Sequence, residues 1–167
     1  RETGKALSSG GARAEYFPAM LGKFLAARAK EDPKLVSISS AVPGGTGFTP
    51  DVRRAMGAQY VDVGIAEEEA AAIASGLARG GARPVWTTYA TFIQRAYDQI
   101  AQDICVNGNA AVINVVGASV YGMNDITHIC FFDIPMLSHI PNLVYLAPTT
   151  WEEFVAMEDW AIRQDER

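Results

Sequence analysis

The sequence is short of several residue types that would point to particular protein classes. Only two cysteines, Cys105 and Cys130, occur in 167 residues, which is too few for a disulfide framework. The 14 basic residues are outnumbered by 19 acidic ones, so the basic face that nucleic-acid binding needs is not expected. No apolar run approaches the roughly 20 residues of a membrane span, and no basic-then-apolar leader opens the chain. We therefore predict a cytoplasmic protein without a nucleic-acid or membrane partner.

The common phosphate-binding signatures are also missing. The sequence contains neither a Gly-x-Gly-x-x-Gly pattern nor a P-loop, which makes a generic nucleotide-binding sheet a weak interpretation. What is present is an ordinary globular composition, with 49% hydrophobic and 20% charged residues, in a chain long enough for one domain. Residues 1–12 are polar and rich in Gly and Ser. We interpret them as a leader or linker, and residues 13–167 as the domain.

Apolar runs alternate with helical patterns along the chain. The predicted helices include one that begins at Glu67, and two of the others have threonine as their expected N-caps, Thr91 and Thr150. Strands that are apolar throughout and separated by helices indicate a mainly parallel sheet with helices on both faces, an α/β three-layer sandwich. The predicted strands are 35–39, 60–63, 84–88, 111–116 and 143–147, and the other predicted helices are 15–30, 50–58, 91–105, 133–138 and 150–163.

Three consecutive glutamates, residues 67–69, follow one of the predicted strands and open an alanine-rich helix. The simplest explanation is that acids stabilise a first helical turn through the macrodipole. The helical spacing separates the three, however, because Glu67 heads a stripe of small apolar residues that includes Ala70 and Ala74, whereas Glu68 heads a more polar line. Such a stripe lets a neighbouring helix or subunit approach closely. Glu67 is therefore expected to be poorly solvated and able to share a proton with a ligand's nitrogen.

Four separated motifs, in one order along the chain, carry a resemblance to a known family. They are "VPGGTG" at 42–47, "GIAEEE" at 64–69, "YATFIQRAYDQ" at 89–99 and "FFDIPMLSHIPNLVYLAPTTWEEF" at 131–154. Together they resemble the pyrimidine-binding domain of transketolase-like thiamine diphosphate enzymes, and within that group they look most like the 1-deoxyxylulose-5-phosphate synthases. The resemblance implies the thiamine diphosphate-binding fold and a ketol-transferring transferase.

The resemblance implies how the cofactor would be held. By position Glu67 matches the acid that hydrogen-bonds the aminopyrimidine ring and activates the cofactor, and Phe92 matches the aromatic residue that stacks on that ring. Ile65 and Tyr89 match further cofactor contacts. On periodicity alone, Phe92 could equally fill the core beside Ala96.

Three residues are implied at the substrate. Tyr89 and Arg95 match positions at the family's substrate channel, where an arginine suits a phosphate or carboxylate. His128 matches a histidine near substrate hydroxyls or developing charge, so it is a second catalytic candidate beside the glutamate. The alternative for Arg95 is a solvated helix arginine paired with Asp98 or Gln99.

Several positions depart from the family pattern. Gly117 stands where the synthase has arginine, Asn124 where the family has aspartate, and Glu69 where a histidine is usual. These differences leave the cofactor end intact and leave the donor and acceptor open. Two alternatives therefore stand beside the main hypothesis: the β-subunit half of a 2-oxoacid dehydrogenase, and a non-catalytic assembly domain of the same fold.

The family's diphosphate-binding segment, a Gly-Asp-Gly…Asn pattern that holds Mg²⁺, does not occur in this chain. We therefore assign no metal ligand here, and expect thiamine diphosphate and Mg²⁺ to depend on a diphosphate-binding domain or partner subunit. The resemblance also implies a homo-oligomer and a ketose or sugar-phosphate substrate. The chain by itself is predicted to be inactive.

Overall fold

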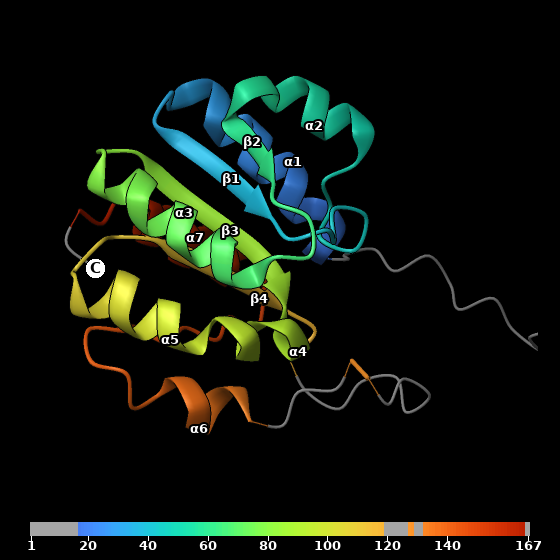
Figure 1. Ribbon diagram of the computed structural model, residues 1–167. Coiled ribbons are helices and arrows are strands. Elements are labelled where there is room, and N and C mark those ends of the chain that lie inside the picture. The colour runs from blue at the N-terminus through green and yellow to red at the C-terminus, as the bar shows by residue number, and fades with distance from the viewer. Residues whose placement is uncertain (1–16, 119–126, 129–131, 166–167) are drawn as a thin grey trace, which may run out of the picture.

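A four-stranded parallel sheet forms the centre of the computed structural model, which describes residues 17–118, 127–128 and 132–165 (Figure 1). The strand order is β2-β1-β3-β4, and every neighbouring pair is parallel. This confirms the predicted α/β class and four of the five predicted strands. The predicted leader, residues 1–12, lies outside the described residues. The strands are β1 (Leu35–Ser39), β2 (Tyr60–Asp62), β3 (Arg83–Tyr89) and β4 (Val112–Val116).

Helices cover both faces of the sheet, as the apolar strands predict. On one face α3 (Glu67–Arg79) and α5 (Tyr97–Gln99) lie over the sheet, and α1 (Phe17–Glu31) and α7 (Trp151–Ile162) lie behind it (Figure 1). Two hydrophobic clusters result, because successive strand residues point to opposite faces. On β1, Ile38 belongs to the cluster beneath α3. Leu35, three residues earlier and so on the opposite face, belongs to the cluster beneath α1.

Two helix starts follow from threonine caps. The hydroxyl of Thr150 accepts a hydrogen bond from the backbone N–H of Glu153, which confirms the predicted cap of α7. Thr49 caps α2 (Pro50–Met56) in the same way, and a short 3₁₀ turn, η1 (Gly57–Gln59), extends that helix. A further short helix, α6 (Asp133–Leu137), lies at the predicted place.

The predicted helix at 91–105 is present but begins earlier and changes its geometry along its length. Ala90 is already helical directly after β3, so the prediction of Thr91 as N-cap was wrong. The Thr91 hydroxyl instead donates to the carbonyl of Thr127. The segment runs through α4 (Ala90–Ile93), η2 (Gln94–Ala96), α5 and a π-helical stretch, η3 (Ile100–Val106).

The predicted strand at 143–147 was wrong. The segment is part of no sheet, and Val144, Tyr145 and Leu146 remain between 39% and 45% exposed. A strand needs a partner backbone to pair with. Here a cavity of about 630 Å³ is lined both by β4, the edge strand, and by this segment. The apolar composition of the segment therefore faces a cavity and not a neighbouring strand.

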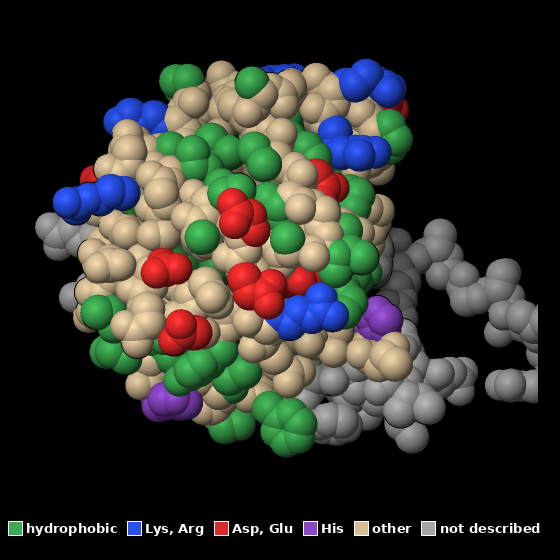
Figure 2. Space-filling model, viewed as in Figure 1, with side chains coloured by type: hydrophobic (Ala, Val, Ile, Leu, Met, Phe, Trp, Pro, Cys, Tyr) green, Lys and Arg blue, Asp and Glu red, His purple; other side chains and the backbone are tan. Residues whose placement is uncertain are grey.

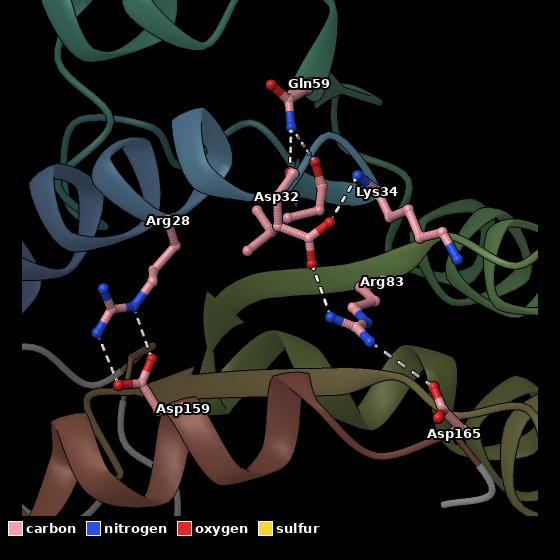
Figure 3. A network of polar contacts seen from close by, with 8 residues as sticks. Arg28, Asp32, Lys34, Gln59, Arg83, Asp159 and Asp165 are labelled. Atoms are coloured by element: carbon pink, nitrogen blue, oxygen red, sulfur yellow. Dashed lines mark hydrogen bonds and ion pairs between the residues drawn. The ribbon is translucent and has the colours of Figure 1, made fainter.

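Ion pairs join helices to one another and to the sheet near the side where the strands begin. Arg28 of α1 donates two hydrogen bonds to Asp159 of α7, at 2.6 and 2.7 Å. Arg83, the first residue of β3, pairs with Asp32, which precedes β1 (Figure 3). These contacts lie near the amino ends of the strands, opposite the carboxyl ends where parallel sheets bind ligands. Among the described helices, none has the length and apolar character needed to cross a membrane.

Candidate functional site

The candidate site lies where β2 and β3 end. Glu67 opens α3 shortly after β2, and Tyr89 is the last residue of β3. Phe92 and Arg95 follow Tyr89 on the next helical turns, α4 and η2. Because the carboxyl ends of parallel strands meet at one edge of a sheet, residues from two distant parts of the chain come together there.

Glu67 is the buried member of the three glutamates. It is 1% exposed, whereas Glu68 and Glu69 are exposed. Ala70 and Ala74, on the same side of α3, are fully buried. The prediction that Glu67 heads the packed face of the helix is therefore confirmed, and the lack of bulk in that face is what lets α3 lie close to the sheet.

The charge of Glu67 is matched by Arg95. A guanidinium nitrogen of Arg95, Nη1, lies 3.2 Å from Oε2 of Glu67, although 28 residues separate them in the chain. The arginine side chain is 52% exposed and its carbon Cζ lies 6.0 Å from the centre of the Phe92 ring. Arg95 therefore bridges the buried acid and the aromatic residue. The sequence considerations had suggested Asp98 or Gln99 as its alternative partners.

Three rings gather beside this ion pair. The centroid of Phe92 lies 6.1 Å from that of Tyr89 and 5.3 Å from that of His128, and all three rings meet nearly edge to face. His128 is half-buried, and its Nδ1 lies 2.7 Å from the hydroxyl of Thr127. Since Thr91 donates to the Thr127 carbonyl, this part of the loop is tied to α4. Most of the predicted loop at 117–131, including Cys130, lies outside the described residues.

The glycine-rich loop at 42–47 also reaches the site. A Cβ atom added to Gly45 would lie only 1.9 Å from the hydroxyl oxygen of Tyr89, so this position has room for glycine alone unless the tyrosine moves. Gly44, the preceding residue, has open space at the same place. The loop therefore helps to fix the position of Tyr89, a contact that the sequence motif did not reveal.

The structure brings together five of the six predicted site residues: Glu67, Tyr89, Phe92, Arg95 and His128. The sixth, Ile65, lies between β2 and α3 and is 77% exposed, on the surface near the start of the helix. On the face that carries α3, acidic side chains gather and a basic side chain lies against them (Figure 2). Within the described part of the chain no group of three or more His, Cys, Asp or Glu side chains is placed to hold a metal ion.

A second buried acid, Glu158 on α7, was not singled out from the sequence. It is 4% exposed, and Oε1 accepts a hydrogen bond of 2.9 Å from the amide nitrogen Nδ2 of Asn114 on β4. Burial raises the pKa of Glu158 to about 7, against a smaller lowering by the Asn114 hydrogen bond and a further rise from Asp159. The helical spacing held the signal, because the partly buried Phe154 and the buried Ile162 lie four residues before and after it on the packed side of α7.

His139, the second histidine of the chain, makes contacts within the fold. Its Nε2 lies 2.8 Å from the Tyr97 hydroxyl and its Nδ1 lies 2.9 Å from the Pro135 carbonyl. Both ring nitrogens are therefore engaged within the fold, away from the ring cluster around Phe92. The buried Cys105 is a free thiol whose pKa is raised by burial, so it is a poor nucleophile.

The side chains around Glu67 include the groups that could contact a planar heteroaromatic ring with a basic nitrogen. A buried carboxylate can exchange a hydrogen bond and a proton with that nitrogen, and the half-buried Phe92 ring offers a stacking surface beside it. Tyr89, His128 and Arg95 add polar groups around the same position. These are the contacts that an aminopyrimidine would use.

Comparison with known proteins gives a consistent result. The sequence profile described as "Transketolase, pyrimidine binding domain" matches residues 17–167. The chain is 38% identical over 144 residues to a 1-deoxy-D-xylulose-5-phosphate synthase from Clostridium tetani, covering 86% of this chain and 23% of that protein. It is 36% identical over 164 residues to the synthase of the same name from Clostridium acetobutylicum, covering 98% and 26%.

Two solved structures share the fold. A structure titled "Split gene transketolase, inactive beta4 tetramer" aligns with a TM-score of 0.75 at 23% identity, over 89% of this chain and 47% of that one. A transketolase from Leishmania mexicana aligns with a TM-score of 0.75 at 20% identity, over 85% of this chain and 23% of that one. The chain thus spans about a quarter of the length of the curated relatives that it matches.

Proposed function

The chain belongs to the transketolase pyrimidine-binding domain family, and from this premise we propose that it forms the pyrimidine-binding part of a thiamine diphosphate-dependent ketol-transferring enzyme. The transketolase and deoxyxylulose-phosphate synthase types are the activities we favour. The relatives support this choice, since the first of them are named 1-deoxy-D-xylulose-5-phosphate synthases. The observation that carries the proposal is the burial of Glu67 beside Phe92 at the carboxyl end of the sheet.

Thiamine diphosphate, when bound, would supply a thiazolium carbon, C2, that attacks a carbonyl and then accepts its electrons. In this proposal Glu67 holds and moves a proton at the aminopyrimidine ring nitrogen, which favours removal of the C2 proton. Phe92 would stack on the ring and fix its orientation, with Tyr89 and Ile65 completing the contact. The low exposure of Glu67 excludes water from that proton transfer.

Arg95 and His128 would act on the substrate. The half-exposed guanidinium of Arg95 suits a phosphate or carboxylate group. The imidazole of His128 lies with its centroid 5.3 Å from that of Phe92. We propose a ketose or sugar-phosphate as substrate. A reassembled enzyme that uses 2-oxoacids with reductive acyl transfer and ignores ketose phosphates would instead favour the dehydrogenase β-subunit.

The remaining parts of such an enzyme would come from a diphosphate-binding domain or subunit, which would hold Mg²⁺ as well. The exposed side of α3 carries Ala72 and Gly76, so a partner could approach the helix closely. We therefore propose that the site is completed across a protein–protein contact, in a homo-oligomer, and that this chain alone does not turn over substrate. Turnover by the isolated chain with thiamine diphosphate and Mg²⁺ would refute this.

The test is hydrogen–deuterium exchange at C2 of thiamine diphosphate, measured by NMR on the assembled enzyme. We expect Glu67→Gln to slow the exchange by about 10²–10³-fold, because glutamine cannot transfer the proton. Glu68→Gln is the matched control, since the neighbouring acid is exposed, and should leave the rate unchanged. Equal rates in all three proteins would exclude Glu67 as the activating acid.

Cofactor binding separates an enzyme from a non-catalytic assembly domain. By calorimetric titration, Phe92→Ala should weaken thiamine diphosphate binding by about tenfold, the loss expected when a stacking ring is removed. An assembly that never binds the cofactor, or binds it equally well with Phe92→Ala, would support the assembly-domain alternative.

A further inference from the structure

The contact between Arg95 and Glu67 places a cation on the acid that the proposed function assigns to the cofactor. Glu67 is almost completely buried and held by the start of α3, whereas half of the Arg95 side chain is exposed. The two partners therefore differ in freedom. The acid is fixed in place, and the guanidinium can leave with little loss of packing.

The guanidinium is also similar in chemistry to a protonated aminopyrimidine. Both are planar, delocalised cations whose N–H groups donate to a carboxylate, and both favour the face of an aromatic ring. Nη1 of Arg95 lies 3.2 Å from Oε2 of Glu67, and Cζ lies 6.0 Å from the centre of Phe92. Arg95 thus uses the same acid and the same ring that the heterocycle would use.

A ring nitrogen that bonds to Oε2 of Glu67 would need the position that Nη1 of Arg95 occupies, 3.2 Å from that oxygen. We propose that Arg95 is a displaceable latch on Glu67: it neutralises the buried acid until the cofactor's ring nitrogen takes its place, and is then released toward the substrate. This inference rests on the proposed function. Arg95 acts here as a positioning residue that links cofactor binding to the presentation of a cation at the site's mouth.

The released guanidinium has a defined neighbourhood. It follows Phe92 by one helical turn and so lies beside the ring cluster that includes His128. An anionic group on the substrate could pair with the guanidinium there, but only once Glu67 no longer holds it. The latch therefore predicts opposite effects of one substitution. Removing the arginine should strengthen cofactor binding and weaken the use of an anionic substrate.

The experiment is a calorimetric titration of the assembled enzyme with thiamine diphosphate in the presence of Mg²⁺. Arg95→Met keeps the length of the side chain and removes its charge. We expect it to tighten thiamine diphosphate binding by about threefold to fivefold, the strength of a partly exposed ion pair. The same variant should lose about tenfold in kcat/KM for a sugar-phosphate, the loss expected for a charged hydrogen bond. Arg79→Met, at the far end of α3, is the matched control and should change neither value.

Coupling to the acid tests the latch itself. In a Glu67→Gln background, Arg95→Met should no longer tighten cofactor binding, because the competition acts through the carboxylate. Weaker or unchanged binding in Arg95→Met, or tightening that persists without the carboxylate, would overturn the latch. Arg95→Gln provides a second variant if the methionine protein does not fold. Cofactor binding that needs Glu67 but ignores Arg95 would overturn only the latch, whereas binding that ignores both Glu67 and Phe92 would overturn the proposed function.

Discussion

Two buried glutamates in this domain are compensated in different ways. Glu67, at the carboxyl end of the sheet, is 1% exposed and faces the cation of Arg95. Glu158, on the helix that covers the opposite face, is 4% exposed and faces the neutral amide of Asn114. Both positions cost free energy of desolvation, but among the residues that the structure describes only Glu67 of the two has a charged partner in contact with it.

The difference shows where this fold can hold a charge. A half-exposed cation at the carboxyl end of the sheet can neutralise a buried acid, and in our proposal it is exchanged for the cofactor's ring nitrogen. An amide in the middle of a strand can donate one hydrogen bond but cannot neutralise a carboxylate, so the pKa of Glu158 rises, chiefly through burial. The first arrangement suits ligand exchange, and the second makes stability depend on pH.

The largest effect is expected at Glu158. Its pKa is about 7 in the folded protein against 4.5 for the free group, so the folded state binds the proton more tightly. The contribution of this group to the free energy of unfolding is greatest below pH 4.5 and falls by roughly 3 kcal/mol as the pH rises to 7 and above. Glu158→Gln should remove that fall, and the variant should be more stable than the wild type at pH 8.

Urea unfolding between pH 4.5 and pH 8 measures this difference. The matched control is Glu152→Gln, an exposed acid on the same helix, which should follow the wild-type curve. A Glu158→Gln curve parallel to the wild type would mean that Glu158 does not titrate in this range, and the contrast between the two acids would be lost.

The hydrogen bond from Asn114 should matter most when Glu158 is charged. Asn114→Val removes the donor and is expected to destabilise the protein by about 2 kcal/mol at pH 8, the usual cost of a buried group left without its partner. At pH 5 the carboxyl is protonated and the loss should be smaller. Equal losses at the two pH values would show that packing, and not the hydrogen bond, sets the contribution of this residue.

At Glu67 we expect cofactor affinity to depend on the position of the neighbouring Tyr89 ring. Gly45→Ala would press a methyl group against the Tyr89 hydroxyl, which must move away. We expect thiamine diphosphate to bind to the assembled enzyme about fivefold more weakly, a loss of about 1 kcal/mol, since displacing Tyr89 perturbs the rings beside Glu67. Gly44→Ala has open space and is the control. If both substitutions have the same effect on affinity, the close approach is not important.

The smallest effect is expected at the ion pair between Arg28 and Asp159. Arg28→Met should lower the free energy of unfolding by about 0.5–1 kcal/mol, and less at high salt, because the pair is only partly buried. Thermal unfolding at two salt concentrations measures it. The control is Arg54→Met, which breaks the largely exposed pair with Asp51 on α2 and should cost less. A salt-independent loss larger than that at Glu158 would reverse the ranking of buried over exposed charges.

Much of the fold could be predicted because it follows from local patterns. Runs such as 35–39 and 84–88 are apolar and short, and the alternation with helical periods indicates a parallel sheet. The segment at 143–147 has the same composition but forms no strand, because pairing depends on which backbone lies beside it. Composition alone does not supply that information, and the same limitation explains why Thr91 was misplaced as a cap.

For the candidate site, the sequence predicted which glutamate is buried but not which side chain it contacts. Glu67 could be separated from Glu68 because helical spacing assigns each to a different side of α3. The partner of Glu67 could not be predicted, since Arg95 lies 28 residues away and reaches it only through the arrangement of two strands and two helices. The same holds for Gly45 and Tyr89, whose contact joins the loop after β1 to the last residue of β3.

The sequence by itself determined the layered α/β architecture, the family to which the chain belongs, and which of three adjacent acids lies buried. Periodicity and short motifs carry that information, because they depend only on neighbours along the chain. The tertiary structure alone decided what each buried acid faces: a half-exposed arginine in one place and a strand asparagine in the other. Those contacts depend on how distant segments pack, and packing sets the electrostatic surroundings that give each acid its chemistry.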